Sequence, residues 1–141
     1  MKIGYTCGVY DLFHVGHLNL FERCKENCDY LIVGVCDDEY VRRFKNKDPM
    51  IGEQDRARIV GALKCVDKVI IIDSDTTVDK LKAYNNEAYD VLFVGSDWEG
   101  SERFLATEKQ FKENNLNIEI KFLPYTQTIS TTQIIEKLKN R

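Results

Sequence analysis

The sequence predicts an α/β protein of three layers, with helices on both faces of a central parallel sheet of five strands. Two patterns support this prediction. Five short apolar runs rich in Val and Ile lack strict alternation with polar residues, which is typical of strands buried on both faces of a parallel sheet. Segments with apolar residues at helical spacing lie between these runs, and such alternation indicates parallel strands joined by right-handed crossovers.

The elements are expected in a simple order along the chain. The strands are expected at residues 2–7, 29–36, 66–72, 90–94 and 117–123. Four helices between them are expected around Val15, Leu18, Leu20 and Phe21, then Ile59 and Leu63, then Val78 and Leu81, then Phe104, Leu105 and Phe111. A last helix is expected around Ile134, Ile135 and Leu138.

One segment interrupts this alternation of strands and helices. Residues 42–55 begin with basic side chains and hold one of the two prolines, so we expect a functional loop there. No repeat, low-complexity tract or linker is visible, and we expect a single domain over residues 1–141. Open α/β sheets bind ligands at the carboxyl ends of their strands, which is where a site is expected.

Composition narrows the class of protein. Lys and Arg total 20 against 23 Asp and Glu, and the resulting net charge of −3 argues against nucleic acid as the main partner. No apolar run approaches the roughly 20 residues of a membrane-spanning helix, and the N-terminus shows no signal-peptide pattern. Five cysteines without a Cys-x-x-Cys pair favour a reducing compartment, so we expect a cytoplasmic protein whose cysteines pack in the core.

The most informative segment is Gly8-Val9-Tyr10-Asp11-Leu12-Phe13-His14-Val15-Gly16-His17, between the first strand and the first helix. Gly16 lets a phosphate approach the backbone of the first turn closely. Helix amides and two imidazole N–H groups would converge on one anion, and the helix dipole favours neutral rings. Such donors stabilise charge that develops during phosphoryl or nucleotidyl transfer.

Two other interpretations of the histidines are open. His17 lies on one helical face with Cys24 and Cys28, so a zinc site is conceivable, although Phe21 occupies the same face. A purely structural role for both histidines would leave Gly16 unexplained.

Two further motifs follow at later strand ends. Thr128-Ile129-Ser130-Thr131-Thr132 precedes the last helix and offers hydroxyls and free amides for a phosphate, although helix capping alone would also explain it. Gly95-Ser96-Asp97-Trp98-Glu99-Gly100 follows the fourth strand.

The three motifs together resemble those of the cytidylyltransferases, within the Rossmann-like HxGH nucleotidyltransferase superfamily, and most of all the glycerol-3-phosphate cytidylyltransferases. The resemblance implies transfer of CMP from CTP to a small phosphorylated alcohol, with Mg²⁺ and release of pyrophosphate. It implies catalytic roles for His14, His17, Lys47 and Arg56. Nucleotide contacts are implied for Gly8, Val9, Tyr10, Gly16, Asp97, Trp98, Ile129, Ser130 and Thr131.

The acceptor phosphate would be bound by cations that offset the repulsion between two phosphates: Lys45, Lys47 and Arg56. Asp11 would bind the magnesium ion or order the loop, and both roles stay open. Trp98 would shape the nucleotide pocket or pack in the core. A homodimer is expected by analogy with the family, with no nucleic acid or membrane partner.

The sequence also departs from the family pattern. Tyr125, Gln127 and Thr128 replace an Arg, a Glu and a Gly of the signature, and Ser96 replaces an Asp. Residues 73–77 lack the Trp that enzymes acting on glycerol-3-phosphate or phosphocholine usually carry. Alternatives are therefore another phospho-alcohol or phospho-amino alcohol such as phosphocholine or phosphoethanolamine, an adenylyltransferase of the same superfamily, or a non-catalytic nucleotide-binding scaffold.

Overall fold

A computed structural model describes residues 1–124 and 130–140 of the chain. Tyr125, Gln127, Thr128 and Ile129, which the sequence singled out, lie outside the described residues. The five strands form one parallel sheet in the order β3-β2-β1-β4-β5. Their bounds are Ile3–Gly8, Tyr30–Cys36, Lys68–Ile72, Val91–Gly95 and Glu119–Leu123 for β1 to β5. The predicted five-stranded parallel sheet is confirmed, with each strand within a few residues of its expected place.

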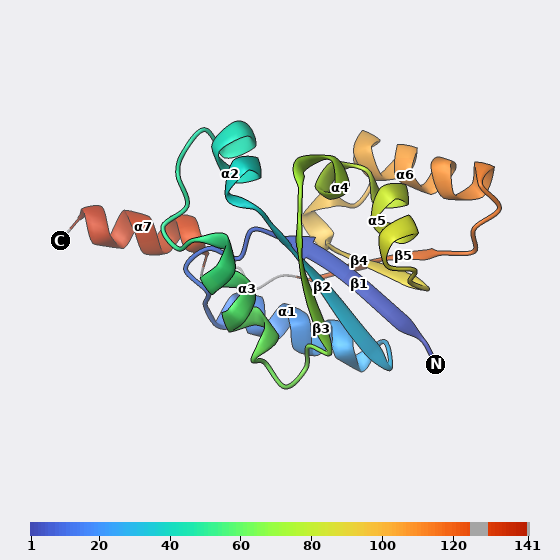
Figure 1. Cartoon of the computed structure of the whole chain (residues 1–141), viewed down its shortest axis with the longest axis horizontal. Coiled ribbons are helices and arrows are strands. Elements are labelled where there is room, and N and C mark those ends of the chain that lie inside the picture. The colour runs from blue at the N-terminus through green and yellow to red at the C-terminus, as the bar shows by residue number, and fades with distance from the viewer. Residues whose placement is uncertain (125–129, 141) are drawn as a thin grey trace.

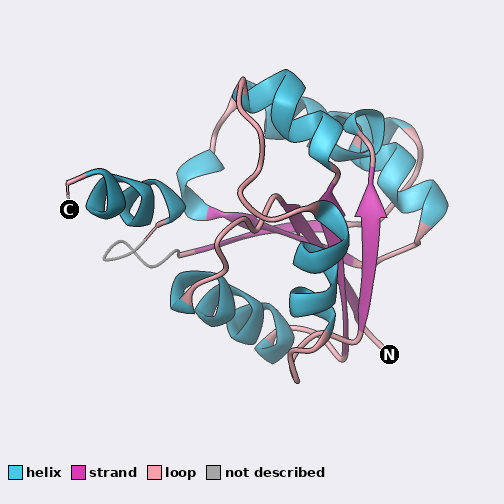
Figure 2. Ribbon diagram, turned by 60° about the vertical axis from the view of Figure 1, so that its left-hand side comes forward, coloured by secondary structure: helices cyan, strands magenta, loops and turns pink. Residues whose placement is uncertain are grey.

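Helices cover both faces of the sheet, which confirms the three-layer Rossmann-like arrangement (Figures 1 and 2). The helices of the structure are α1 Val15–Glu26, α2 Asp38–Lys45, α3 Glu53–Gly61, α4 Ser74–Val78, α5 Lys80–Asn86, α6 Glu102–Glu113 and α7 Thr131–Lys139. A short 3-10 helix, η1, spans Ser96–Trp98 after β4. In Figure 1, α7 extends away from the rest of the molecule, with its C-terminal end outermost.

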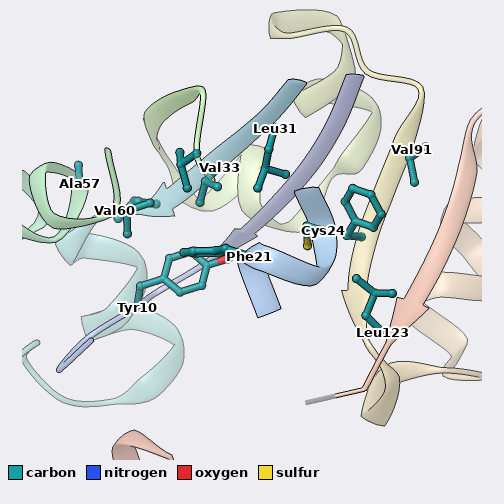
Figure 3. Packing of buried hydrophobic residues seen from close by; sticks show 12 residues of the cluster. Tyr10, Phe21, Cys24, Leu31, Val33, Ala57, Val60, Val91 and Leu123 are labelled. Carbon is teal, nitrogen blue, oxygen red and sulfur yellow. The ribbon is translucent and has the colours of Figure 1, made fainter. Parts of the chain in front are cut away.

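The core is divided by the sheet into two clusters. On one face, Phe21 and Cys24 of α1 and Val60 of α3 pack against Leu31 and Val33 of β2 (Figure 3). On the other face, Ala83 of α5 and two phenylalanines of α6, Phe104 and Phe111, pack against Ile32 and Leu92. Neighbouring residues of β2 point to opposite faces, and both faces are apolar. This double burial explains why the strands read as continuous apolar runs.

The segment expected as a loop over residues 42–55 is partly helical, which corrects the sequence prediction. Helix α2 begins after Asp37, whose carboxylate accepts the N–H of Tyr40, and ends at Asn46 in the left-handed conformation (φ 54°). Only Val41 is buried in α2, so no apolar periodicity marks it in the sequence. The irregular stretch is therefore residues 46–52, between α2 and α3.

The five cysteines are free: Cys24 and Cys36 are buried, whereas Cys7, Cys28 and Cys65 are half-buried. Among the described residues, no helix is both long and apolar enough to cross a membrane.

Candidate active site

The first motif forms a turn at the carboxyl end of β1, held in an unusual backbone conformation. Tyr10 and Leu12 both have left-handed dihedral angles, with φ of 56° and 50°. This conformation costs a residue other than glycine roughly 1–2 kcal/mol, so the surrounding contacts must offset it. Strain of this kind is often found where a protein needs an exact backbone shape at a functional site.

Asp11 supplies those contacts. Its carboxylate accepts the N–H groups of Leu12 at 3.1 Å, Met50 at 2.8 Å and Ile51 at 3.0 Å, which ties the 46–52 segment to the turn. Asp11 therefore orders the loop, the second of its two expected roles. Its other expected role, as a magnesium ligand, stays a prediction. No group of three His, Cys, Asp or Glu side chains suited to a metal ion occurs in the described part of the chain.

His14 and His17 form a reciprocal cap at the start of α1. The Nδ1 of His14 accepts the N–H of Gly16 at 3.0 Å, and the Nδ1 of His17 accepts the N–H of His14 at 3.2 Å. The two histidines thus lie together around Gly16, and their expected contact with an anion stays a prediction. The alternative zinc arrangement does not form, because Cys24 is buried in the core and the Cys28 thiol donates to the Cys24 carbonyl.

Both imidazoles are held neutral. Burial lowers the pKa of His14, and burial together with His14 lowers the pKa of His17 to about 4. A neutral ring whose Nδ1 accepts a hydrogen bond carries its proton on Nε2. Each ring therefore presents an Nε2–H donor, which is what the sequence argument required for contact with phosphate oxygens.

Arg56 has a different place from the one expected. Its side chain is fully buried, and it donates to the carbonyls of Val9, Cys36 and Ile51 at 2.7, 2.7 and 2.8 Å. A fourth bond, 2.6 Å long, joins it to the Asp38 carboxylate. The expectation that Arg56 contacts the acceptor phosphate is corrected: the guanidinium is enclosed by the protein and binds together the ends of β1, β2 and the 46–52 segment.

The motif that contains Ser130 and Thr131 lies beside the turn after β1. Ser130 caps α7 by accepting the N–H of Gln133 at 3.1 Å, and the Thr131 hydroxyl donates to the Asp11 carbonyl at 2.7 Å. The start of α7 is therefore attached to the turn after β1. The first N–H groups of a helix have no partner within it, so they are available to an anion.

A cavity of about 360 Å³ lies where these pieces meet, and we call it the His17 cavity. It is lined by Val9, Tyr10, Asp11, His17, Val41, Lys45, Lys47, Thr131 and Thr132. The His17 cavity is therefore lined by an imidazole, two exposed lysines and the start of α7. This lining suits a polyphosphate, because cations and N–H donors surround the cavity. The one carboxylate of the lining, that of Asp11, already accepts backbone N–H groups.

A second cavity of about 230 Å³ adjoins it on the other side of Val9 and Tyr10, and we call it the Lys80 cavity. Lys45 lines both cavities. The backbone of Gly8 and the ring of Trp98 also line the Lys80 cavity, and the Trp98 ring stacks edge-on against Phe104. Trp98 is thus neither a core residue nor part of the His17 cavity. Asp97 is exposed beside it in η1.

The sequence did not identify several polar residues that line the Lys80 cavity, among them Tyr40, Thr77, Lys80 and Arg103. None of them belongs to a recognisable motif. The one sequence signal is the position of Thr77 after β3, at the same edge of the sheet as the other motifs.

An open parallel sheet with an HxGH turn, neutral imidazole donors and a second helix start at one polyphosphate-sized cavity defines a nucleotidyltransferase-type protein. The comparison with known proteins agrees. The cytidylyltransferase-like family matches residues 5–137, and the chain belongs to this family.

Two curated relatives illustrate the similarity. The chain is 37% identical over 137 residues to the bifunctional protein HldE of Koribacter versatilis, covering 96% of this chain and 27% of that protein. It is 34% identical over 139 residues to the bifunctional protein HldE of Helicobacter pylori strain G27, covering 98% of this chain and 28% of that protein. The chain thus spans about a quarter of the length of these relatives.

Solved structures share the fold. A lipopolysaccharide core biosynthesis protein from Thermoplasma volcanium superposes with a TM-score of 0.77 at 24% identity, over 90% of this chain and 99% of that one. Thermotoga maritima TmcAL, bound with alpha-thio ATP, superposes with a TM-score of 0.71 at 16% identity, over 99% of this chain and 50% of that one. At these identities the comparison supports the fold.

Proposed function

We propose that this nucleotidyltransferase transfers CMP from CTP to the phosphate of a small phosphorylated compound. A phosphate oxygen of the acceptor attacks the α-phosphorus of CTP, and the bond from that phosphorus to the oxygen bridging to the β-phosphate breaks. Pyrophosphate leaves with the electron pair of that bond, and the product is a CDP derivative of the acceptor. No covalent intermediate with the protein forms.

The observation that carries this proposal is the neutral histidine pair, in which His17 lines the cavity and His14 stacks on it with the ring centroids 3.9 Å apart. The Nε2–H groups of His14 and His17 would donate to the α-phosphate and to the leaving pyrophosphate, where negative charge develops. Because each ring is fixed through its Nδ1, little reorganisation accompanies the reaction. Such electrostatic preorganisation is the main source of catalysis in phosphoryl-type transfer.

The remaining groups of the cavity would hold the two anions. The amides at the start of α7 and the Ser130 hydroxyl would bind the β- and γ-phosphates. Lys45 and Lys47 would bind the acceptor phosphate, since both are exposed and line the cavity. Arg56 and Asp11 would act indirectly, by fixing the backbone that surrounds the reacting atoms.

Mg²⁺ is proposed as a companion of the nucleotide. It would be held by phosphate oxygens and water, which Mg²⁺ commonly retains in nucleotide sites. The homodimer also remains a prediction, which light scattering on the purified chain would check.

Adenylyl transfer from ATP is the second candidate. The departures at Tyr125, Gln127 and Thr128 change the cytidylyltransferase signature at the segment before α7. The relatives reported above carry the name HldE and not that of a glycerol-3-phosphate cytidylyltransferase. Glycerol-3-phosphate thus remains only a first acceptor to try.

The test is pyrophosphate release with Mg²⁺, each of the four nucleoside triphosphates and a panel of phosphorylated acceptors, with the product identified by mass spectrometry. CTP-dependent release supports the proposal, whereas ATP-dependent release supports the second candidate. The His14→Asn variant serves as the blank for contaminating activity. If every pair of nucleotide and acceptor gives the rate of this blank, the catalytic proposal is overturned in favour of a nucleotide-binding scaffold.

A further inference from the structure

Two cations meet in the Lys80 cavity without a carboxylate partner among the residues that the structure describes. Lys80 is only 4% exposed. Its Nζ donates to the Thr77 carbonyl and lies 3.2 Å from the Cys7 sulfur. The Nη2 of Arg103 reaches the same carbonyl at 3.4 Å. Buried charges in proteins are normally paired, so this arrangement favours an anionic ligand.

Arg103 adds a second, independent observation. Its Nε is buried and has no hydrogen-bond partner among the described residues. Its guanidinium carbon lies 5.4 Å from the centre of the Trp98 ring, which holds the planar group at the wall of the cavity. The Tyr40 hydroxyl is close by: burial raises the pKa of Tyr40, and Arg103 acts in the opposite direction. Among the described residues, the Arg103 Nε is thus a buried donor without an acceptor, close to the buried ammonium of Lys80.

The Lys80 cavity opens onto the place where the reacting phosphates would meet. Val9, Tyr10 and Lys45 line both cavities. An acceptor whose phosphate lies at Lys45 can therefore extend its other end toward Lys80 and Arg103. A neutral nucleobase would not require two cations there.

Resting on the proposed nucleotidyl transfer, we propose that the acceptor carries a second anionic group, a carboxylate or a second phosphate, and that Lys80 and Arg103 bind this group in the Lys80 cavity. Both anions offer several oxygens to a guanidinium and an ammonium. The proposal disfavours glycerol-3-phosphate, whose far end is neutral. It disfavours phosphocholine and phosphoethanolamine more strongly, because two like charges would meet in a buried site.

Binding can be measured through Trp98, the single tryptophan of the chain, which lines the cavity. The probes are 3-phosphoglycerate for the carboxylate, 2,3-bisphosphoglycerate for the second phosphate, glycerol-3-phosphate for a neutral end and phosphocholine for a cation. We expect a saturable change in tryptophan fluorescence with at least one of the first two probes. Its Kd should be about 10-fold or more below that for glycerol-3-phosphate, as expected for charge-assisted hydrogen bonds. The better of the two anionic probes identifies the group.

Variants separate ligand binding from a structural role of the cations. Lys80→Met keeps most of the length of the side chain and removes its charge, and Arg103→Gln removes the charge at the less buried position while keeping a polar end. Each should abolish the preference for the anionic probe while leaving the KM for the nucleotide unchanged. Lys82→Met is the matched control, since Lys82 is exposed and lies 3.7 Å from the Asp75 carboxylate; it should keep the preference.

Two results overturn the inference: equal affinity for the anionic and neutral probes, or variants that lower the Tm and leave the preference intact. A change in the KM for the nucleotide would assign the cavity to the nucleotide instead, which also overturns it. Failure of the proposed function is seen separately, as the absence of pyrophosphate release with every acceptor. The fluorescence preference does not depend on turnover and decides the inference in either case.

Discussion

The rings of His14 and His17 stack with their centroids 3.9 Å apart, and the Nδ1 of His17 accepts the backbone N–H of His14 itself. Each ring thus has one nitrogen committed to the helix start and one left for a ligand. Nδ1 therefore contributes to folding, and Nε2 contributes to chemistry. Single substitutions can measure the two contributions independently.

Replacing His14 by Asn should therefore keep the fold and remove the activity. The Asn side-chain oxygen can take the place of Nδ1 at the N-cap, where Asn is among the preferred residues, but no donor replaces Nε2–H. We expect the Tm to stay near that of the wild type and kcat to fall by about 10²–10³. His14→Ala should lose the same activity and also about 1 kcal/mol of stability. Equal kcat in wild type and His14→Asn would contradict the assignment of Nε2.

Stability should depend on pH through His17. Its ordinary pKa of 6.5 falls to about 4 in the folded chain, so between these values the unfolded chain binds a proton that the folded chain does not. The contribution of His17 is fully present above pH 6.5 and is lost as the pH decreases toward 4. Tm measured from pH 4 to 8 should fall less steeply on the acid side in His17→Asn than in wild type. Parallel curves for the two proteins would refute the shift.

Arg56→Met should destabilise the fold strongly. The substitution leaves the carbonyls of Val9 and Cys36 and the carboxylate of Asp38 without their buried partner. Breaking a buried charge pair of this kind costs about 3–5 kcal/mol, which chemical denaturation would reveal. Arg58→Met, two residues along α3 at an exposed position, is the control and should change stability little. A small loss at Arg56 would show that the enclosed guanidinium is dispensable.

Lys47 should show the opposite pattern. Lys47 is exposed and lines the His17 cavity, so Lys47→Met should leave the Tm unchanged and lower kcat/KM by about 10-fold or more. Lys64→Met, exposed in another part of the surface, is the matched control. If both variants have wild-type kinetics, Lys47 does not bind a substrate phosphate.

Thr131→Val tests the attachment of α7. Val has nearly the same shape but cannot donate to the Asp11 carbonyl, so about 1 kcal/mol of stability should be lost. Nucleotide affinity, measured by calorimetry, should weaken because the start of α7 is no longer held at the cavity. Thr132→Val, whose side chain is exposed in the same helical turn, should weaken it less.

The sheet could be predicted from the sequence because its strands are buried on both faces and therefore form unbroken apolar runs. Helix α2 could not, because seven of its eight residues are polar or partly exposed and Val41 alone is buried. The sequence shows that Arg56 is a cation but not which way its side chain points. The carbonyls that enclose it come from the ends of β1 and β2. The burial of Lys80 could not be predicted for a similar reason. A lysine is normally exposed, and only contacts with distant parts of the chain bury it.

The bond from Thr131 to Asp11 joins residues 120 positions apart. During synthesis on the ribosome, the turn after β1 emerges early, whereas the start of α7 follows only after the last strand. The cavity for the triphosphate would thus be completed only once the start of α7 has been synthesised, after the sheet has been able to assemble. Proteolytic removal of α7 would leave both core clusters in place but abolish activity. Activity would therefore indicate whether α7 is intact.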